Sequence, residues 1–122
     1  MNITVDRQGT SKVAVIESED VVIKEVQDAL DLMATVRYTE DCDKIVLDKC
    51  NVAEDFFELK TKLAGDVLQK YTNYQVKLAI VGDFGVYDSK SLRDFIYECN
   101  QGKQFFFLPD RQAALEALHK LG

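Results

Sequence analysis

The side chains of this sequence that could do chemistry lie where two predicted strands end. Asp48 closes the apolar run at residues 44–48, and Asp83 follows the apolar run at residues 76–81. If both runs are parallel strands, their carboxyl ends meet at one edge of a sheet, where open α/β sheets bind ligands. The two carboxylates either hold a ligand at that edge or cap local turns, and fold analogy alone does not decide between these alternatives.

Cys50 is the one thiol placed at this predicted edge. A reactive thiol needs a pKa lowered by a cation or a helix N-terminus, and Lys49 and the following predicted helix could supply both. The alternative is a thiol without a chemical role. The sequence has three cysteines, and Cys42 and Cys99 form no CxxC pair with Cys50. This pattern favours free thiols in a reducing compartment over a disulfide framework or a metal site.

Aromatic residues are expected near the same edge. Phe84 and Tyr87 follow Asp83, and exposed aromatic side chains often anchor protein interfaces; packing onto the flanking helices is the alternative. Phe56 and Phe57 are neighbours in a predicted helix, so their side chains point about 100° apart. We expect one of them to enter the core and the other to reach the rim, and we include Phe57 among the candidate partner contacts.

No nucleophile and base lie together in the sequence, and no metal cluster or phosphate-binding loop is recognisable. His119, the only histidine, falls in the last turn of the final predicted helix, where it would cap the negative helix end. Ser89 and Ser91 precede a predicted helix, and Ser91 with Asp94 fits a capping box. The sequence therefore predicts no catalytic residue, metal or cofactor.

Composition narrows the class of protein. The chain has 122 residues, which fits a single domain over residues 1–122. The formal net charge of −6 and the scattered basic residues argue against binding to nucleic acid or to anionic membranes. No apolar run approaches the roughly 18 residues of a membrane helix, and the first residues lack a secretory signal pattern. We therefore expect a cytoplasmic protein.

The elements that must position these residues alternate between strands and helices. The first two strands are predicted to pair as an antiparallel hairpin, and the strand–helix–strand order afterwards requires parallel pairing. The predicted fold is α/β in the order β-β-α-β-α-β-α-β-α, with a mostly parallel five-stranded sheet. The predicted strands are 3–6, 12–17, 44–48, 76–81 and 104–108, and the predicted helices are 19–38 with Ser18 as N-cap, 54–74, 89–100 ending at Gly102, and a last one with Asp110 as N-cap.

One face of this sheet raises the question of a second subunit. If the parallel strands step in one direction, right-handed crossovers place their connecting helices on the same face. The opposite face, with Val46, Ala79 and Val81, would then lack cover. Either the strand order reverses or a second copy covers this face, which makes a homodimer a prediction.

The pattern of the second half resembles the STAS domain of anti-sigma-factor antagonists and sulfate-transporter tails. The stretches that carry the resemblance are 45–48, 76–82 and 107–110 followed by 113–115. Phosphorylatable members have an Asp-Ser-Ser/Thr-Gly motif at the helix after the third strand, whereas this chain has Ala-Glu-Asp-Phe-Phe at 53–57. Two carboxylates thus occupy the place where a phosphate would meet the helix end, and the resemblance does not imply the usual phosphorylation switch.

The chain is also similar, over nearly its whole length, to a bacterial family called domain of unknown function four-one-eight-zero. The similar runs are 26–33, 54–57, 78–84 and 104–107. This resemblance implies a fold and no established activity.

Three function classes follow from the sequence. The preferred one is a non-catalytic regulatory module of STAS type that binds a protein partner. The second is a small-ligand sensor that uses the strand ends at Asp48, Asp83 and Phe84. The third is an enzyme acting through Cys50 or a carboxylate pair, which requires two titratable groups within hydrogen-bond reach in one cleft.

Overall fold

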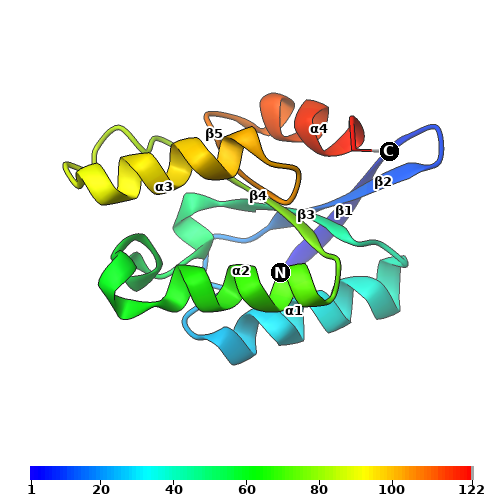
Figure 1. Ribbon diagram of the computed structural model, residues 1–122. Coiled ribbons are helices and arrows are strands. Elements are labelled where there is room, and N and C mark those ends of the chain that lie inside the picture. The colour runs from blue at the N-terminus through cyan, green and yellow to red at the C-terminus, as the bar shows by residue number, and fades with distance from the viewer. Residues whose placement is uncertain (122) are drawn as a thin grey trace.

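The computed structural model describes residues 1–121 (Figure 1). Gly122, the last residue of the predicted domain range, lies outside the described residues. The elements are β1 (Asn2–Gln8), β2 (Ser11–Glu17), α1 (Val26–Glu40), β3 (Lys44–Asp48), α2 (Leu63–Asn73), β4 (Lys77–Val81), α3 (Lys90–Gln101), β5 (Phe105–Leu108) and α4 (Arg111–His119), with one-turn 3₁₀ helices at Lys49–Asn51, Glu54–Phe57 and Leu59–Thr61. The predicted α/β class and element order are confirmed.

The five strands form one sheet in the order β1-β2-β3-β4-β5. β1 and β2 are antiparallel, and the other neighbours are parallel. The hairpin reverses over Gly9 and Thr10, where Gly9 has a φ of 61°, a backbone conformation that glycine adopts without steric cost. The predicted mostly parallel sheet with an N-terminal antiparallel hairpin is therefore confirmed.

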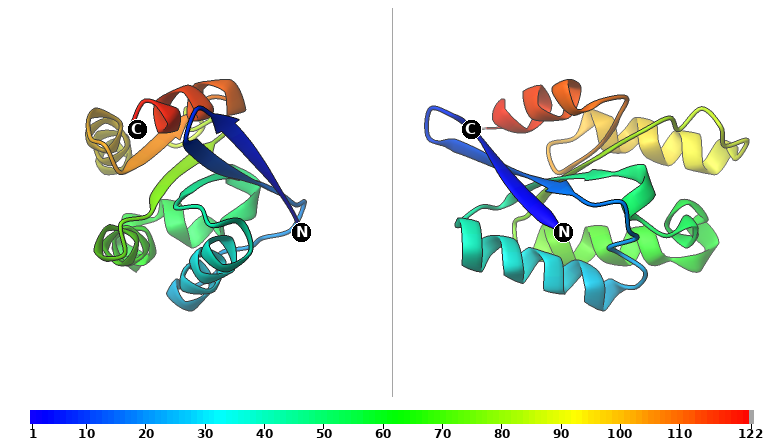
Figure 2. Two further views of the ribbon diagram at one scale, coloured as in Figure 1. Left: turned by 90° about the vertical axis from the view of Figure 1, so that its right-hand side faces the viewer. Right: turned by 180° about the vertical axis from the view of Figure 1, so that it is seen from behind.

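Helices α1, α2 and α3 pack against one face of the sheet. Each connects two neighbouring parallel strands, so the right-handed crossover rule places all three on the same side. Figures 1 and 2 show α1 and α2 side by side beneath the sheet, and α3 lies mainly against β5. The sheet residues buried on this face include Ala14, Ile16, Ile45, Leu47, Leu78, Ile80, Phe105 and Phe107.

Helix α4 covers the opposite face, where Figure 2 shows it above the sheet. The strand order does not reverse, and because α4 covers this face, neither a reversed order nor a second copy is needed to bury it. α4 follows the last strand and leads to no further strand, so the crossover rule does not fix its side. Its Ala114 and Leu118 bury Val46, Ala79 and Val81. The sheet face thus gives no reason for a homodimer, which stays an untested prediction.

Helix α1 begins at Val26, later than predicted. Ser18 is not its N-cap, because residues 21–23 are drawn into an extended segment that forms a parallel bridge between Ile23 and Val52. The β-branched run Val-Val-Ile at 21–23 favours this extended backbone. The helix starts instead with Glu25 as N-cap, and the Asp28 carboxylate accepts hydrogen bonds from the Lys24 and Glu25 amides at 2.9 and 3.2 Å.

The single helix predicted at 54–74 is also wrong. Two 3₁₀ turns precede α2, and Lys62 separates them from α2 with a left-handed φ of 68°. The Thr61 hydroxyl donates to the carbonyls of Asp55 and Glu58, at 2.6 and 2.8 Å, and so fixes a turn in place of a helix. This geometry buries both Phe56 and Phe57, so the expectation that one of them reaches the rim is wrong.

The predicted ends of the last two helices are mostly confirmed. Gly102 follows the last residue of α3, and the Asp110 carboxylate accepts a hydrogen bond from the Ala113 amide at 2.8 Å as the N-cap of α4. The cap of α3 is Ser89, whose hydroxyl accepts from the Leu92 amide at 3.1 Å. The capping box predicted for Ser91 does not form, because Ser91 already lies inside the first turn.

Candidate functional site at the carboxyl edge of the sheet

The carboxyl ends of β3 and β4 lie side by side, with Asp48 paired to Val81 in the sheet register. A hollow of about 470 Å³ opens at this edge. Its lining is Val21, Asp48, Lys49, Cys50, Val52, Ala53, Glu54, Gly82 and Asp83, and we call it the carboxyl-edge hollow. Three predicted candidates therefore meet in one place: Asp48, Cys50 and Asp83.

Asp48 holds the turn that follows β3. Its carboxylate accepts a hydrogen bond from the Cys50 amide at 3.0 Å, and the Asp48 amide donates to Oδ1 of Asn51 at 2.9 Å. Asn51 is fully buried, and its Nδ2 donates to the carbonyls of Ser18 and Asp20 at 2.8 and 2.9 Å. Asn51 therefore ties residues 18–20 to the end of β3. The sequence analysis missed it, since an asparagine in a polar turn gives no sign of burial.

Asp83 holds the turn that follows β4 in the same way, because its Oδ1 accepts a hydrogen bond from the Gly85 amide at 2.9 Å. Just before it, Gly82 lies against Lys49. A Cβ at position 82 would come within 2.7 Å of the Lys49 Cβ, a separation that folded proteins do not tolerate. Glycine at position 82 is therefore what lets the two strand ends approach.

Lys49, Tyr87 and Glu54 form a polar contact over the hollow. The Lys49 ammonium donates to the Asp83 carbonyl at 3.0 Å and lies 4.7 Å from the centre of the Tyr87 ring. The Tyr87 hydroxyl donates to Oε2 of Glu54 at 3.1 Å. Burial, followed by the hydrogen bond and charge of Glu54, raises the pKa of Tyr87 from 10.0 to about 12.

The predicted aromatic candidates pack together beneath this contact. Phe57 is only 4% exposed, stacks on Tyr87 with ring centres 5.2 Å apart, and lies 5.8 Å from Phe84. Phe84 in turn meets Phe107 of β5 edge-on at 5.5 Å. Phe84 and Tyr87 are half-buried. These rings join the loop at 83–88 to the core and give the edge a firm base.

Cys50 is exposed, and its surroundings do not activate it. Burial of the sulfur and then the hydrogen bond and charge of Asp48 raise the pKa of the Cys50 thiol. The Lys49 ammonium, which was expected to lower this pKa, is bound to Asp83 instead. The helix after Cys50 is a single 3₁₀ turn, so it contributes little of the predicted dipole.

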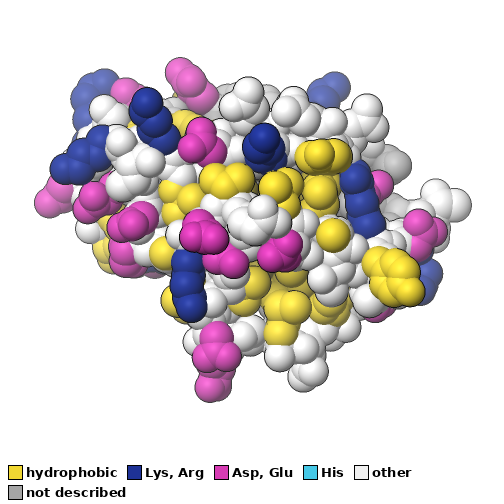
Figure 3. Space-filling view, turned by 90° about the horizontal axis from the view of Figure 1, so that it is seen from below, with side chains coloured by type: hydrophobic (Ala, Val, Ile, Leu, Met, Phe, Trp, Pro, Cys, Tyr) yellow, Lys and Arg dark blue, Asp and Glu magenta, His cyan; other side chains and the backbone are white. Residues whose placement is uncertain are grey.

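The surface of the hollow is acidic with apolar margins. Three exposed carboxylates line it: Asp48, Glu54 and Asp83. Lys49 is the single basic residue of the lining, and its ammonium is already engaged. Val21 in the lining is 41% exposed, and Val86 in the adjoining loop is 62% exposed. Figure 3 shows the molecule from below, where hydrophobic side chains collect in the middle of the face between acidic and basic ones.

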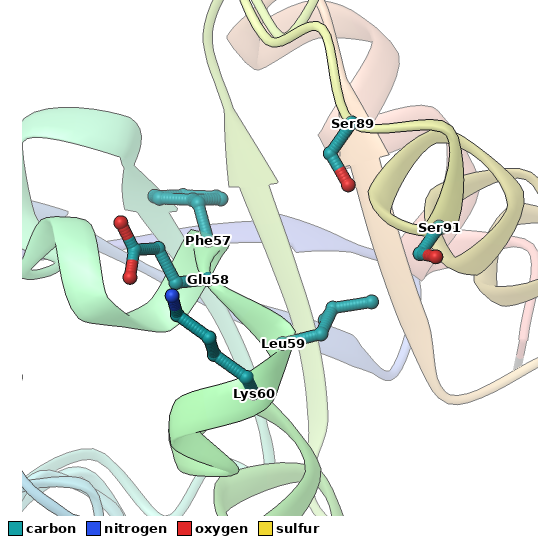
Figure 4. A pocket seen from close by; sticks show the side chains of 6 residues that line it. All are labelled: Phe57, Glu58, Leu59, Lys60, Ser89 and Ser91. Carbon is teal, nitrogen blue, oxygen red and sulfur yellow. The ribbon is translucent and has the colours of Figure 1, made fainter.

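A second hollow of about 340 Å³ lies between the 3₁₀ turns and the start of α3. Figure 4 shows its lining: Phe57, Glu58, Leu59, Lys60, Ser89 and Ser91. The Ser89 hydroxyl is used as the N-cap of α3. The charges of Glu58 and Lys60 offset each other, so this hollow has no net preference for a charged ligand.

His119 lies in the last turn of α4, as predicted, but its ring is hydrogen-bonded to the hairpin and not to the carbonyls of the helix end. Its ring nitrogens contact Ser11 and Asp6 of the hairpin at 2.8 Å each. No sequence signal links residues more than 100 positions apart, which is why the sequence analysis found no partner for this histidine. Within residues 1–121 no group of three or more His, Cys, Asp or Glu side chains could hold a metal, and no helix is long and apolar enough to cross a membrane.

Comparison with known proteins gives the family. The chain matches the family described as "Domain of unknown function (DUF4180)" over residues 8–118 and belongs to it, which confirms the resemblance seen in the sequence. No curated protein matches the chain. Among solved structures, it is similar to the crystal structure of a candidate anti-sigma factor antagonist from Thermotoga maritima, with a TM-score of 0.47 and 11% identity over 96% of this chain and 94% of that chain.

Proposed function

We propose that this protein is a regulatory interaction module that binds a basic segment of a protein partner at the carboxyl-edge hollow, without catalysis at that edge. The observation that carries the proposal is the lining of the hollow. Three exposed carboxylates surround an apolar floor of Val52 and Ala53, and the single ammonium in the lining is bound internally.

Electrostatics supports a cationic partner group. The Lys49 ammonium keeps its positive charge at the Asp83 carbonyl, but the three carboxylates of Asp48, Glu54 and Asp83 outnumber it in the lining. A Lys or Arg side chain would gain from this field, and the gain would shrink as salt screens it. Val21 and Val86 supply exposed apolar contact beside the charges.

Rigidity of the edge also supports recognition. Both turns at the hollow are fixed by side-chain caps from Asp48 and Asp83, and the aromatic packing of Phe57 holds the loop above them. A surface that is ordered before binding loses less entropy when a partner docks.

Site-directed photocrosslinking tests the proposal. A photoreactive phenylalanine analogue replaces Val86, which is 62% exposed at the edge, or Tyr38, which is 92% exposed near the end of α1 and serves as the control. In a lysate of the source organism we expect a discrete protein adduct from position 86 that weakens at high salt, and none from position 38. Adducts of equal yield from both positions, or from position 38 alone, would refute the proposal.

A small cationic ligand is the second candidate for the same hollow. The volume of about 470 Å³ lies within the range of small-molecule pockets, and the carboxylates would again recognise positive charge. Polyamines and other organic cations should then raise the melting temperature by mass action, and a Glu54→Gln variant should respond less. Absence of any shift with a panel of cations would leave the protein partner as the remaining candidate.

A further inference from the structure

A continuous polar chain joins four side chains at the amino edge of the sheet, opposite the carboxyl-edge hollow. Lys44 begins β3, Ser11 begins β2, His119 ends α4, and Asp6 lies on β1. The Lys44 Nζ lies 2.9 Å from the Ser11 Oγ, which lies 2.8 Å from the His119 Nδ1. The His119 Nε2 is in turn 2.8 Å from the Asp6 Oδ2.

When His119 is neutral, the chemistry of these groups fixes the direction of each hydrogen bond. An ammonium has no acceptor, so Lys44 donates to Ser11. A carboxylate has no donor, so the His119 Nε2 carries a proton and donates to Asp6. In neutral His119 the Nδ1 is then the acceptor, and the Ser11 hydroxyl must donate to it. Each proton therefore points from Lys44 towards Asp6, which is the arrangement of a serine nucleophile with its base and the group that orients the base.

The surroundings separate a shielded base from an accessible nucleophile. The His119 side chain is 4% exposed and the Asp6 side chain is 40% exposed, whereas Ser11 is partly exposed. A hollow of about 270 Å³, lined by Gln8, Glu116, His119 and Lys120, adjoins the histidine. Ser11 does not line this hollow, but its cross-strand partner Gln8 does.

We propose that Ser11 is an activated nucleophile that accepts the acyl group of small esters. The Ser11 Oγ forms a bond to the ester carbonyl carbon as its proton passes to the His119 Nδ1. The carbon–oxygen bond to the alcohol breaks, and His119 returns the proton to the departing alkoxide. Water then attacks the acyl-serine by the same route, releases the carboxylic acid and restores Ser11. Lys44 stabilises negative charge at the Ser11 oxygen, and Asp6 is a positioning residue that holds the His119 tautomer.

A biotinylated fluorophosphonate tests the proposal, because the serine oxygen displaces fluoride and the product is stable. Tryptic digestion at Arg7 and Lys12 isolates residues 8–12, and fragmentation distinguishes Ser11 from Thr10. We expect the folded wild type to be labelled at Ser11 and Ser11→Ala to be unlabelled. Thr10→Ala, the matched control, should react at the wild-type rate. Asp6→Asn should slow labelling at least about 100-fold, the lower end of general-base effects, and Asp6→Glu should recover part of the rate.

Two results would overturn the proposal. The first is an unlabelled Ser11 in wild-type protein whose circular dichroism shows it to be folded. The second is labelling that is equally fast in folded His119→Gln or Asp6→Asn. If His119→Gln does not fold, Asp6→Asn decides, because Asp6 is 40% exposed on an edge strand and its loss removes less packing. Either result would reduce the chain of hydrogen bonds to a tether between α4 and the hairpin.

Discussion

Replacing Gly82 by alanine should destabilise the protein through a single added methyl group. The new Cβ would lie 2.7 Å from the Lys49 Cβ, about 1 Å closer than two carbon atoms pack at optimal separation. The Lys49 Cβ is attached directly to the backbone, so a rotamer change cannot relieve the contact. Relief requires a shift of the turn after β3 or of the end of β4, and this shift would also displace the Lys49 ammonium from the Asp83 carbonyl.

Overpacking of this kind should lower the free energy of unfolding by about 1–3 kcal/mol. At an unfolding entropy of about 2.1 cal/mol/K per residue over 122 residues, each kcal/mol lowers the melting temperature by about 4 °C. Gly82→Ala should therefore melt about 4–12 °C below the wild type. Gly65→Ala is the matched control, because a Cβ there meets nothing within 4 Å and Gly65 lies in α2. It should gain about 0.5–1 kcal/mol from helix propensity and melt about 2–4 °C higher.

Thermal unfolding followed by circular dichroism measures both variants, and urea titration checks that the m-value is unchanged. The same chemical substitution should shift the melting temperature in opposite directions at the two positions. A Gly82→Ala variant that melts within a degree of the wild type, or a Gly65→Ala variant that loses as much as Gly82→Ala, would refute this prediction.

Four further predictions concern the same edge. Glu54→Gln should lower the pKa of Tyr87 from about 12 towards 10.0. The titration is followed by the ultraviolet absorbance of the phenolate, and the part of the signal that is lost in Tyr87→Phe belongs to Tyr87. An unchanged pKa of Tyr87 in Glu54→Gln would refute the hydrogen bond. Because folding raises this pKa, the stabilisation from Tyr87 is full below about pH 10 and is lost as the pH rises towards 12, so the melting temperature of Tyr87→Phe should depend less on alkaline pH. Asn51→Asp should lower the free energy of unfolding by about 3–5 kcal/mol, because it places a buried carboxylate against the two carbonyl oxygens that Asn51 now donates to. Urea unfolding measures this loss, and a variant as stable as the wild type would contradict the prediction. Cys50 should react with iodoacetamide at neutral pH more slowly than an unstructured cysteine peptide, because its pKa is raised; faster reaction would revive the cysteine-enzyme alternative.

The sequence predicted the parts of this fold that local patterns determine. The apolar runs at 44–48 and 76–81 became β3 and β4, and their parallel pairing brought Asp48 and Asp83 to one hollow. The predicted faces were also correct, because side chains alternate along a strand: Ile45 and Leu47 lie in one cluster and Val46 in the other.

The failures occur where tertiary contacts override local preference. The start of α1 moved because Ile23 pairs with Val52, and the helix expected at 54–74 broke because Thr61 bonds to carbonyls of the preceding turn. The burial of Asn51 depends on a segment about 30 positions away. Ser11 and His119 meet only because α4 crosses to the second face of the sheet, which no rule for crossover helices specifies.

Hydrogen exchange tests most directly that the carboxyl-edge hollow is the partner site. The partner is first identified as a protein that is recovered with the tagged, folded wild type and not with an unfolded bait. This partner is then added in excess, and the amide exchange of the wild type is measured by mass spectrometry with and without it. The account predicts slower exchange at residues 48–54 and 82–88 and unchanged exchange at residues 37–44. Slower exchange confined to other segments, with residues 48–54 and 82–88 unaffected, would contradict it.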